Sequence, residues 1–486
     1  MKSRQLVFLK LLETELVRTL IPAASNDIAR RIATLAADQL YRVRLDETVV
    51  PQLRGDAVAA YRTLLPSLSS YINQALCTRL DQTLSAANAD AVEALDSVLR
   101  SITQALLENN TAAATLLAGK IIAIDAKFRG GKERAFADRH NILVEDDAVG
   151  ASSGSSLNDE QQARLLNFLK QQFPAENNLR IASVVPVPGG FSKQTIFINL
   201  ENNLALPASL VMRCDAAYET TGGSVTAEFP VIQKMYVGGV AVPKPYAVDD
   251  TGAVLGRKFI LVSRAPGINL GNFLVVTHRS REAALDLAGK LAKLHAAPFD
   301  GLESVLEGGR ISASERLMVE IKFHEDMWAG VVNTRAYCID AAFKWLKDNI
   351  ALADGPRGVV HRDVGVHNML FDDNKVSAFL DWETAVIGNP AEDVAYTYYN
   401  VVQMIDWNDY IAAYEKAAGV TMNRRQLDFY TLWGSMRVAV GISRMTDPVL
   451  SGKRINLPEY YLADYFGQTL FERVSSKLAE VLSRRY

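Results

Sequence analysis

The distribution of glycine along the chain constrains its fold more than any other single feature. The 486 residues contain 30 glycines, but only Gly55 and Gly119 lie within the first 129 residues, and the other 28 follow. Glycine is disfavoured inside helices and common where the backbone must turn. The sequence therefore predicts a helical first part and a turn-rich second part.

Residues 1–128 are predicted to form an antiparallel helical bundle. Leucines recur every three or four residues from Leu6 to Leu20, and Ala- and Leu-rich stretches continue through 68–84, 88–108 and 111–126. A packing or dimerisation module is the favoured interpretation, so a homodimer through this domain is left open, and a substrate-covering lid is the alternative. Residues 129–157, with glycines, charge and a Gly/Ser run, are predicted to be a linker.

Charge and composition argue against several classes of protein. Lys and Arg number 52 against 55 Asp and Glu, a net charge of −3, so a strongly basic nucleic-acid binder is not expected. No run approaches about 18 apolar residues, so no membrane span is expected, and the first residues do not resemble a signal peptide. Three widely separated cysteines favour a reducing, cytoplasmic location.

The strongest functional signal lies between residues 359 and 383. Asp363 and Asn368 are five residues apart on one predicted loop, and Asp381 follows 13 residues after Asn368. Phosphoryl transfer needs one carboxylate that orients the attacking hydroxyl and accepts its proton. It also needs a second carboxylate and an amide oxygen that hold Mg²⁺ on the phosphates. The spacing therefore predicts a phosphotransferase built around these three residues.

Upstream residues occur in the order that a kinase fold requires. Gly189, Gly190 and Ser192 lie between two predicted strands, where a loop can approach a phosphate, although a Gly-Gly hairpin turn alone would explain them. Arg213 follows a short apolar run and can neutralise phosphate oxygens, and Glu228 on the next helical segment can pair with it. Solvated surface residues are the alternative interpretation of both.

Residues from about 175 to 450 resemble the aminoglycoside phosphotransferase-like kinase family, which includes choline and homoserine kinases. The resemblance implies an α+β fold: a bilobal, protein-kinase-like unit with a small antiparallel-sheet N-lobe and a helical C-lobe, preceded here by the all-α bundle. The predicted domains are the bundle at 1–128, the linker at 129–157, the N-lobe at 158–262 and the C-lobe with the substrate site at 263–486. The segments that carry the resemblance are 189–195, 291–295, 361–368, 381–383 and 388–395.

The resemblance implies a role for each candidate residue. Asp363 would be the catalytic base, and Asn368 and Asp381 would bind Mg²⁺. Arg213 would contact the phosphates of ATP, with GTP left open, and Glu228 would be its ion-pair partner. The remaining implied positions are Gly189, Gly190 and Ser192 over the phosphates, the hinge at Val262, Ser263 and Arg264, and the supports His361 and Asp393.

Four positions near these segments need comment. Arg213 stands where most kinases have Lys, Asn389 replaces the usual Asp before a proline, and Arg362 stands where members of the family commonly have Gly. The first substitution makes the phosphate geometry less certain, because Arg and Lys are not interchangeable. The substitution at Asn389 affects a structural turn. His367, beside Asn368, is interpreted as a packed loop residue rather than a ligand.

The acceptor is predicted to be a small molecule with a hydroxyl group, with an alcohol, hydroxy acid or hydroxyacyl compound favoured. The sequences of the glycine loop and of the segment 381–383 resemble those of the family branch that is fused to acyl-CoA dehydrogenases. Residues 391–486 contain 11 acidic and 11 basic residues, a balance that argues mildly against a polycationic aminoglycoside. Aromatic surface for a less polar acceptor is expected from Tyr396, Tyr398, Tyr399, Trp407, Tyr430 and Trp433.

Three alternatives remain open at this point. One is an aminoglycoside or macrolide antibiotic kinase. Another is a nucleotide-binding pseudokinase or scaffold that acts through the helical N-terminal domain, although the presence of Asp363, Asn368 and Asp381 argues against it. A protein kinase is disfavoured, because Asp-Trp-Glu at 381–383 replaces Asp-Phe-Gly and no Ala-Pro-Glu follows.

Overall fold

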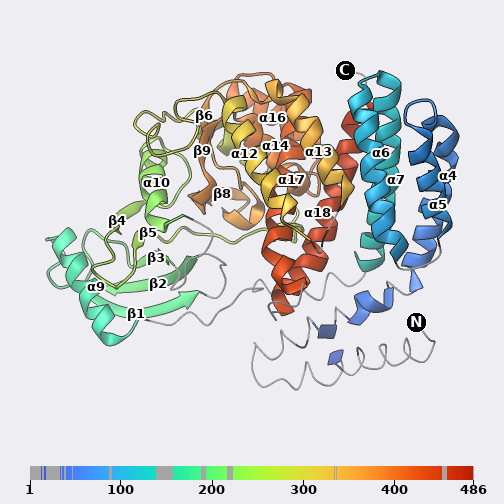
Figure 1. The fold of residues 1–486 in the computed structure, drawn as a ribbon. Helices are drawn as coiled ribbons and strands as arrows, with labels where there is room; N and C mark the ends of the chain where they lie inside the picture. The colour runs from blue at the N-terminus through green and yellow to red at the C-terminus, as the bar shows by residue number, and fades with distance from the viewer. Residues whose placement is uncertain are drawn as a thin grey trace. The chain divides into compact units, whose positions relative to one another are not determined.

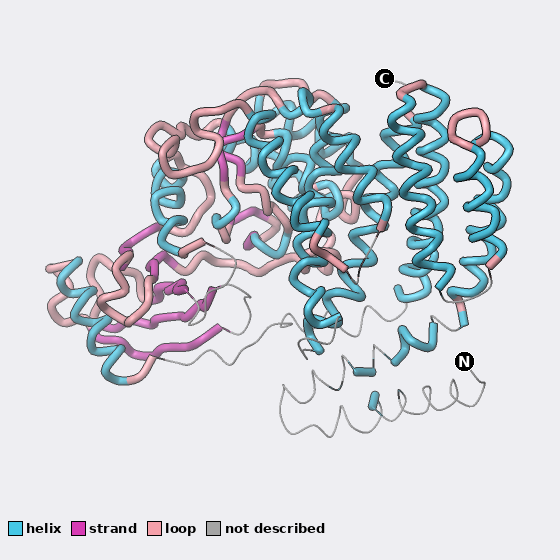
Figure 2. The backbone as a smooth tube through the Cα atoms, viewed as in Figure 1, coloured by secondary structure: helices cyan, strands magenta, loops and turns pink. Residues whose placement is uncertain are grey.

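The structure is a computed structural model in which the chain forms two compact units, each described here by itself. One unit contains residues 144–316 and 353–423, and will be called the catalytic unit; the other contains 1–143, 317–352 and 424–486, and will be called the helical unit. The elements are drawn in Figures 1 and 2. The residues that the structure describes are 48–86, 90–137, 157–187, 193–215, 223–332, 334, 336–450 and 457–484, with positions 13, 16, 17, 33, 36, 37 and 40–45.

A five-stranded antiparallel sheet begins the catalytic unit. Its strand order is β1-β2-β3-β5-β4, and each neighbouring pair is antiparallel. Alternate residues of β2 and β3 point to a core that also contains Leu165 and Leu169 of α9. The bounds are α9 Asp159–Gln172, β1 Arg180–Val187, β2 Lys193–Glu201, β3 Ser209–Asp215, α10 Glu228–Val237, β4 Pro245–Asp249 and β5 Phe259–Ser263.

Helix α9 is capped at its first turn. The Asn158 side chain accepts from the Gln161 backbone N–H while the Gln161 side chain accepts from the Asn158 N–H, which forms a capping box. The helix ends at Gln172, before Pro174. The two strands predicted on either side of the glycine loop are also confirmed, because Val187 at the end of β1 pairs with Thr195 near the start of β2.

The rest of the catalytic unit combines short strands with helices. Strands β6 and β9 form one antiparallel pair, and β7 and β8 form another. In the β7–β8 turn, Asp373 and Asn374 take the left-handed backbone conformation, with φ of 45° and 60°. The bounds are α11 Arg281–His295, β6 Gly358–Val360, β7 Met369–Asp372, β8 Lys375–Phe379, β9 Val386–Gly388, α14 Ala391–Tyr396, α15 Tyr398–Val401 and α16 Trp407–Ala418.

The helical unit joins N-terminal helices to helices from much later in the chain. Helix α7 packs against α6 and α18, and α18 packs against α17. The Asp125 carboxylate on α7 accepts hydrogen bonds from Arg129 and from Ser475 on α18, at 2.8 and 2.6 Å. The bounds are α4 Val50–Leu68, α5 Gln74–Ser85, α6 Asp90–Asn109, α7 Ala112–Ala137, α12 Ala313–Ala329 (residues 313–316 belong to the catalytic unit), α13 Tyr337–Asp348, α17 Arg424–Leu450 and α18 Leu457–Ser483.

Two features of this unit differ from the sequence-based expectation. Helix α7 continues through Gly130 and Gly131 to Ala137, where the sequence predicted a break after residue 128. Packing explains Gly131, because a Cβ there would lie 2.8 Å from a methyl carbon of Leu53 on α4. The predicted boundary at 128 also does not separate the two compact units, since α13, α17 and α18 lie with the N-terminal helices.

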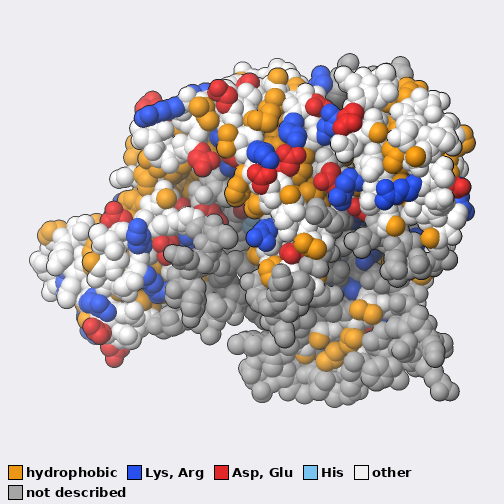
Figure 3. All heavy atoms as spheres, in the orientation of Figure 1, with side chains coloured by type: hydrophobic (Ala, Val, Ile, Leu, Met, Phe, Trp, Pro, Cys, Tyr) orange, Lys and Arg blue, Asp and Glu red, His pale blue; other side chains and the backbone are white. Residues whose placement is uncertain are grey.

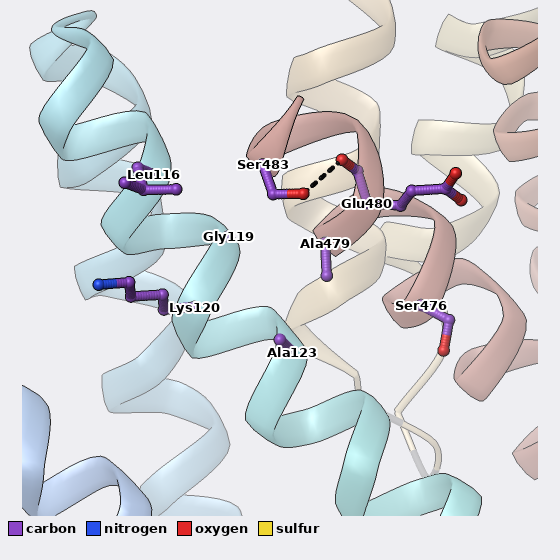
Figure 4. Close-up of a pocket in the computed structure, with 8 residues that line it drawn as sticks. All are labelled: Leu116, Gly119, Lys120, Ala123, Ser476, Ala479, Glu480 and Ser483. Carbon is purple, nitrogen blue, oxygen red and sulfur yellow. Dashed lines mark hydrogen bonds between the residues drawn. The ribbon is translucent and has the colours of Figure 1, made fainter. Parts of the chain in front are cut away.

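Helices α7 and α18 approach each other through small residues. A Cβ at Gly119 would lie 3.1 Å from the Cβ of Leu482, so the glycine permits the close approach. A pocket beside this contact is drawn in Figure 4, with the Ser483 hydroxyl donating to the Glu480 carbonyl. The lining carries no group with metal-ligating or nucleophilic geometry, so this pocket is a packing feature of the two helices. Its lining residues are Leu116, Gly119, Lys120, Ala123, Ser476, Ala479, Glu480 and Ser483.

The surface and the helix lengths agree with the composition. Basic and acidic side chains lie interspersed on the face shown in Figure 3. Among the described residues, no helix combines the length and apolar character that crossing a membrane requires. The fold class predicted from the sequence, an antiparallel sheet and helical lobe preceded by helices, is confirmed.

Candidate active site

The segment between β6 and β7 is held in place by one buried carboxylate. Asp393, in the first turn of α14, accepts the backbone N–H groups of His361 at 2.8 Å and Arg362 at 2.6 Å. The His295 ring nitrogen Nε2 lies 3.1 Å from the same carboxylate. Arg362 has φ of +70°, a conformation that costs energy for a residue with a side chain. Asp393 therefore fixes the strained backbone from which Asp363 projects.

Asp363 lies at the centre of this segment, and both of its carboxylate oxygens accept hydrogen bonds. Oδ2 accepts from the Asn368 amide at 2.7 Å, and Oδ1 accepts from the Tyr396 hydroxyl at 2.5 Å. His367 Nε2 lies 3.6 Å from Oδ1, and its ring packs edge-on against Phe273. These neighbours fix the orientation of the carboxylate, and His367 packs as expected from the sequence.

Asp381 is brought beside Asn368 by the pairing of β7 and β8. Met369 pairs with Phe379, and the Leu380 backbone N–H donates to the Asn368 carbonyl at 2.8 Å. Asp381 itself has φ of +63°, outside the usual range for a non-glycine residue, and its side chain is 32% exposed. Backbone strain of this kind concentrates at functional sites. The Asp381 carboxylate faces the Arg213 guanidinium.

Asn368 and Asp381 together fit a magnesium ion. The Asn368 amide nitrogen is turned to Asp363, which leaves the amide oxygen on the other side. Amide and carboxylate oxygens are the hard ligands that Mg²⁺ takes, and it commonly uses one or two protein groups together with substrate phosphates. No cluster of three or more His, Cys, Asp or Glu side chains suited to a metal occurs among the described residues, so a cage made of protein alone is not present there.

Arg213 links the sheet to the catalytic segment. From β3 its guanidinium donates to Glu228 on α10 at 2.6 Å and to Asp381 at 2.8 Å. The ion pair with Glu228 that the sequence predicted is therefore present, whereas the contact with Asp381 was not predicted. Glu228 Oε2 also accepts the Trp382 backbone N–H at 3.1 Å, so one buried carboxylate holds the cation and the backbone next to Asp381.

The charge state of Glu228 depends on its burial. Burial raises the pKa of the Glu228 carboxyl to about 7, and the Arg213 guanidinium opposes that rise. The nearby negative charge of Asp381 adds to the increase. Glu228 is thus a carboxyl whose ionisation responds to pH near neutrality.

The predicted hinge lies at the end of β5. Val262 pairs with Val211 on β3, and Ser263 exchanges hydrogen bonds with Lys244, at 2.8 Å from its N–H and 2.9 Å to its hydroxyl. The Arg264 guanidinium lies 4.1 Å from the centre of the Phe197 ring. These contacts fix the strand end at which the sequence predicts nucleotide contacts. The other predicted phosphate contacts, Gly189, Gly190 and Ser192, lie outside the described residues.

The structure accounts for two of the substitutions noted in the sequence. Asn389 donates to the Ala353 carbonyl at 3.1 Å and accepts from the Ala391 N–H at 3.0 Å, so the amide caps the turn that an Asp would cap. Arg362 donates to Glu392, which also accepts from Arg316 at 2.7 Å. The arginine side chain therefore fills a buried ionic cluster instead of hindering the loop.

Two of the aromatic residues expected to face an acceptor are buried in the core instead. Tyr430 and Trp433 are 1% and 0% exposed and lie on α17 in the helical unit, so they cannot face an acceptor. Tyr396, Tyr398, Tyr399 and Trp407 are partly exposed and lie in the catalytic unit. The sequence pattern could not separate these groups, because aromatic residues on helices are common in both settings.

One carboxylate with both oxygens hydrogen-bonded, a second carboxylate beside an amide, and an arginine that contacts the second carboxylate are the kinds of group that phosphoryl transfer uses. The architecture around these residues is a kinase-like fold. The crystal structure of a protein from Ralstonia eutropha, assigned as an aminoglycoside phosphotransferase, aligns with a TM-score of 0.52 and 18% identity, over 65% of this chain and 98% of that one.

Residues 183–430, about half of the chain, match the phosphotransferase enzyme family, and the chain belongs to that family. Acyl-CoA dehydrogenase family member 11 from Pongo abelii is 25% identical over 220 residues, which cover 42% of this chain and 27% of that protein. Homoserine kinase from Methylocella silvestris is 30% identical over 177 residues, which cover 36% and 52%. The chain therefore spans about a quarter to a half of the length of these curated relatives.

Proposed function

We propose that this protein transfers the γ-phosphoryl group of ATP to a hydroxyl group of a small molecule. The observation that carries the proposal is the contact of Arg213 with Asp381, because it joins the predicted phosphate-binding cation to the predicted magnesium ligand next to Asn368 and Asp363. Each of these groups has a separate use in phosphoryl transfer, and none is needed by a scaffold.

The proposed reaction assigns one task to each side chain. The acceptor hydroxyl gives its proton to Asp363 while its oxygen bonds to the γ-phosphorus, and the bond from that phosphorus to the bridging oxygen of ADP breaks. Arg213 would contact the phosphates, held in place by Glu228. Asn368 and Asp381 would hold Mg²⁺, which when bound neutralises charge on the phosphates. Positioning and electrostatic stabilisation supply most of the rate in such a site.

An alcohol, hydroxy acid or hydroxyacyl compound is the proposed acceptor class. Phe273 lies between His367 and Tyr396, with ring centres 5.6 and 6.5 Å away, so an aromatic group adjoins the proposed base. Such a surface suits an acceptor with an apolar substituent better than a polycationic sugar. The name of one relative agrees with this class, since homoserine is a hydroxy amino acid.

The test is a transfer assay with the full chain, Mg²⁺ and ATP. The acceptor panel should include L-homoserine, short 3-hydroxy acids, their thioesters, aliphatic alcohols, an aminoglycoside and a macrolide. We expect ADP and a phosphorylated hydroxy compound to form in equal amounts, and Asp363→Asn to prevent both. Transfer only to an aminoglycoside or macrolide would overturn the acceptor class, and the absence of transfer to any hydroxyl compound would overturn the proposed function.

A further inference from the structure

The Tyr396 hydroxyl makes a short contact with the Asp363 side chain. It donates to Oδ1 at 2.5 Å from the last residue of α14, 33 positions along the chain. Hydrogen bonds from a hydroxyl to a carboxylate are short and strong. Tyr396 is therefore tied to the proposed base in a way that the proposed reaction does not require.

Only one oxygen of Asp363 is suited to the acceptor. Oδ2 accepts from Asn368, whose amide must keep that orientation if its oxygen is to face a cation. The incoming hydroxyl would therefore donate to Oδ1, within hydrogen-bond reach of about 2.6–3.2 Å. That is where the Tyr396 hydroxyl lies, so the phenol and an acceptor hydroxyl compete for the same lone pairs or share them.

The surroundings of Tyr396 keep its hydroxyl at this place. Its ring lies beside Phe273, which in turn packs against His367. The helix that carries it starts from the turn capped by Asn389, and Asp393 on the same helix holds the backbone of His361 and Arg362. One short helix thus fixes the base and the group that covers it.

We propose that Tyr396 is a positioning and specificity-determining residue that keeps water from the base until an acceptor alcohol displaces its hydroxyl. The inference rests on the proposed function. Without such a group, a water molecule at Oδ1 would give its proton to Asp363, bond to the γ-phosphorus and release ADP and inorganic phosphate. ATP would then be hydrolysed wherever the acceptor is absent, so a kinase gains by covering the base.

The experiment measures acceptor-independent hydrolysis of Mg-ATP by the full chain. Tyr396→Phe keeps the ring and removes the hydroxyl, which leaves space of about one water molecule beside Oδ1. We expect hydrolysis to rise about tenfold, because losing one charge-assisted hydrogen bond changes an equilibrium by about that factor. The rise should disappear in Tyr396→Phe/Asp363→Asn, since the reaction runs through the base.

Two controls separate this effect from a general disturbance. Tyr236→Phe removes a hydroxyl from a tyrosine that is 41% exposed on α10 and should leave hydrolysis unchanged. Tyr396→Leu is a second variant in case the first loses its fold, which thermal unfolding would report. Intact-mass spectrometry of the wild-type chain after incubation with Mg-ATP should detect no added phosphoryl group.

The outcomes distinguish this inference from the proposed function. If wild-type protein phosphorylates an acceptor but both folded Tyr396 variants hydrolyse ATP no faster than it does, the water-excluding role is wrong and the kinase assignment stands. A phosphoryl group found on Tyr396 would also overturn the role, because the phenol would then be an acceptor itself. If no variant and no wild-type protein transfers phosphate to any compound or to water, both proposals fail.

Discussion

The segments around Asp363 and Asp381 hold their carboxylates in different ways. Asp363 accepts hydrogen bonds from two neutral groups, the Asn368 amide and the Tyr396 hydroxyl, on a loop whose backbone is fixed by a buried carboxylate. Asp381 accepts from a cation, Arg213, and lies in a left-handed backbone conformation. Neutral donors orient a carboxylate that must take up a proton, whereas a cation beside a carboxylate suits a place where phosphate and metal would bind. The difference supports the proposal that Asp363 takes up the proton and Asp381 binds the metal ion.

Replacing the proposed base should have the largest effect. Asp363→Asn keeps an acceptor for Asn368 and Tyr396 but removes the group that takes the proton. We expect turnover to fall by about a thousandfold, within the range for a lost general base, and nucleotide affinity to change by less than about twofold. Steady-state kinetics and calorimetric ADP titration would measure the two effects. Unchanged turnover would remove Asp363 from this role.

On the Asp381 side, Arg213→Lys should have a smaller effect. The guanidinium reaches Glu228 and Asp381 through separate nitrogens, and a lysine ammonium is a single point charge that cannot span both contacts in the same way. We expect the KM for Mg-ATP to rise about tenfold with little change in kcat, because uniform binding is lost. A fall in kcat at constant KM would instead place Arg213 in the transition state alone.

The Glu228 carboxyl, which pairs with Arg213, should make the free energy of unfolding depend on pH. The folded-state pKa of Glu228 is raised from 4.5 to about 7, so its contribution is fully present below 4.5 and is lost as the pH rises through about 7. As the pH rises from 4.5 to about 7, wild type should therefore lose stability relative to Glu228→Gln. Above that pH, the difference in stability between the two proteins should stay constant. Thermal unfolding of both proteins at pH 5, 6, 7 and 8 would measure this. Parallel curves would mean that Glu228 stays ionised throughout.

The smallest effect is expected at the turn before α14, which supports the Asp363 side. Asn389→Asp restores the residue usual in the family but places a carboxylate oxygen opposite the buried Ala353 carbonyl, in place of a donor. We expect a loss of about 1–3 kcal/mol in the free energy of unfolding, the cost of an unsatisfied buried group. Chemical denaturation would measure it, with Asn389→Ala as the matched control. Greater stability in the Asp variant would contradict the assigned hydrogen bonds.

Short-range patterns made part of this site predictable. Asp363, Asn368 and Asp381 lie on one loop and hairpin, so their spacing alone brought them together, and the order of strand and helix suggested the Arg213–Glu228 pair. Contacts between distant segments carried no such signal. The hydrogen bond from Tyr396 to Asp363 depends on how the elements pack in space. The same is true of the contact between Arg213 and Asp381, which are 168 positions apart in the sequence. The same reason explains why the predicted end of α7 was wrong. Gly131 is typical of a helix end in the sequence, but in the structure it lies inside the helix and packs against Leu53.

The most direct test of the account compares Asp363→Asn with Asp381→Asn by titrating each with ATP, with and without Mg²⁺, in a calorimeter. We expect Asp363→Asn to bind ATP more tightly when Mg²⁺ is present, as wild type does. Asp381→Asn should lose that dependence on Mg²⁺. If both variants keep it, or both lose it, the division between a proton-accepting and a metal-binding carboxylate is wrong.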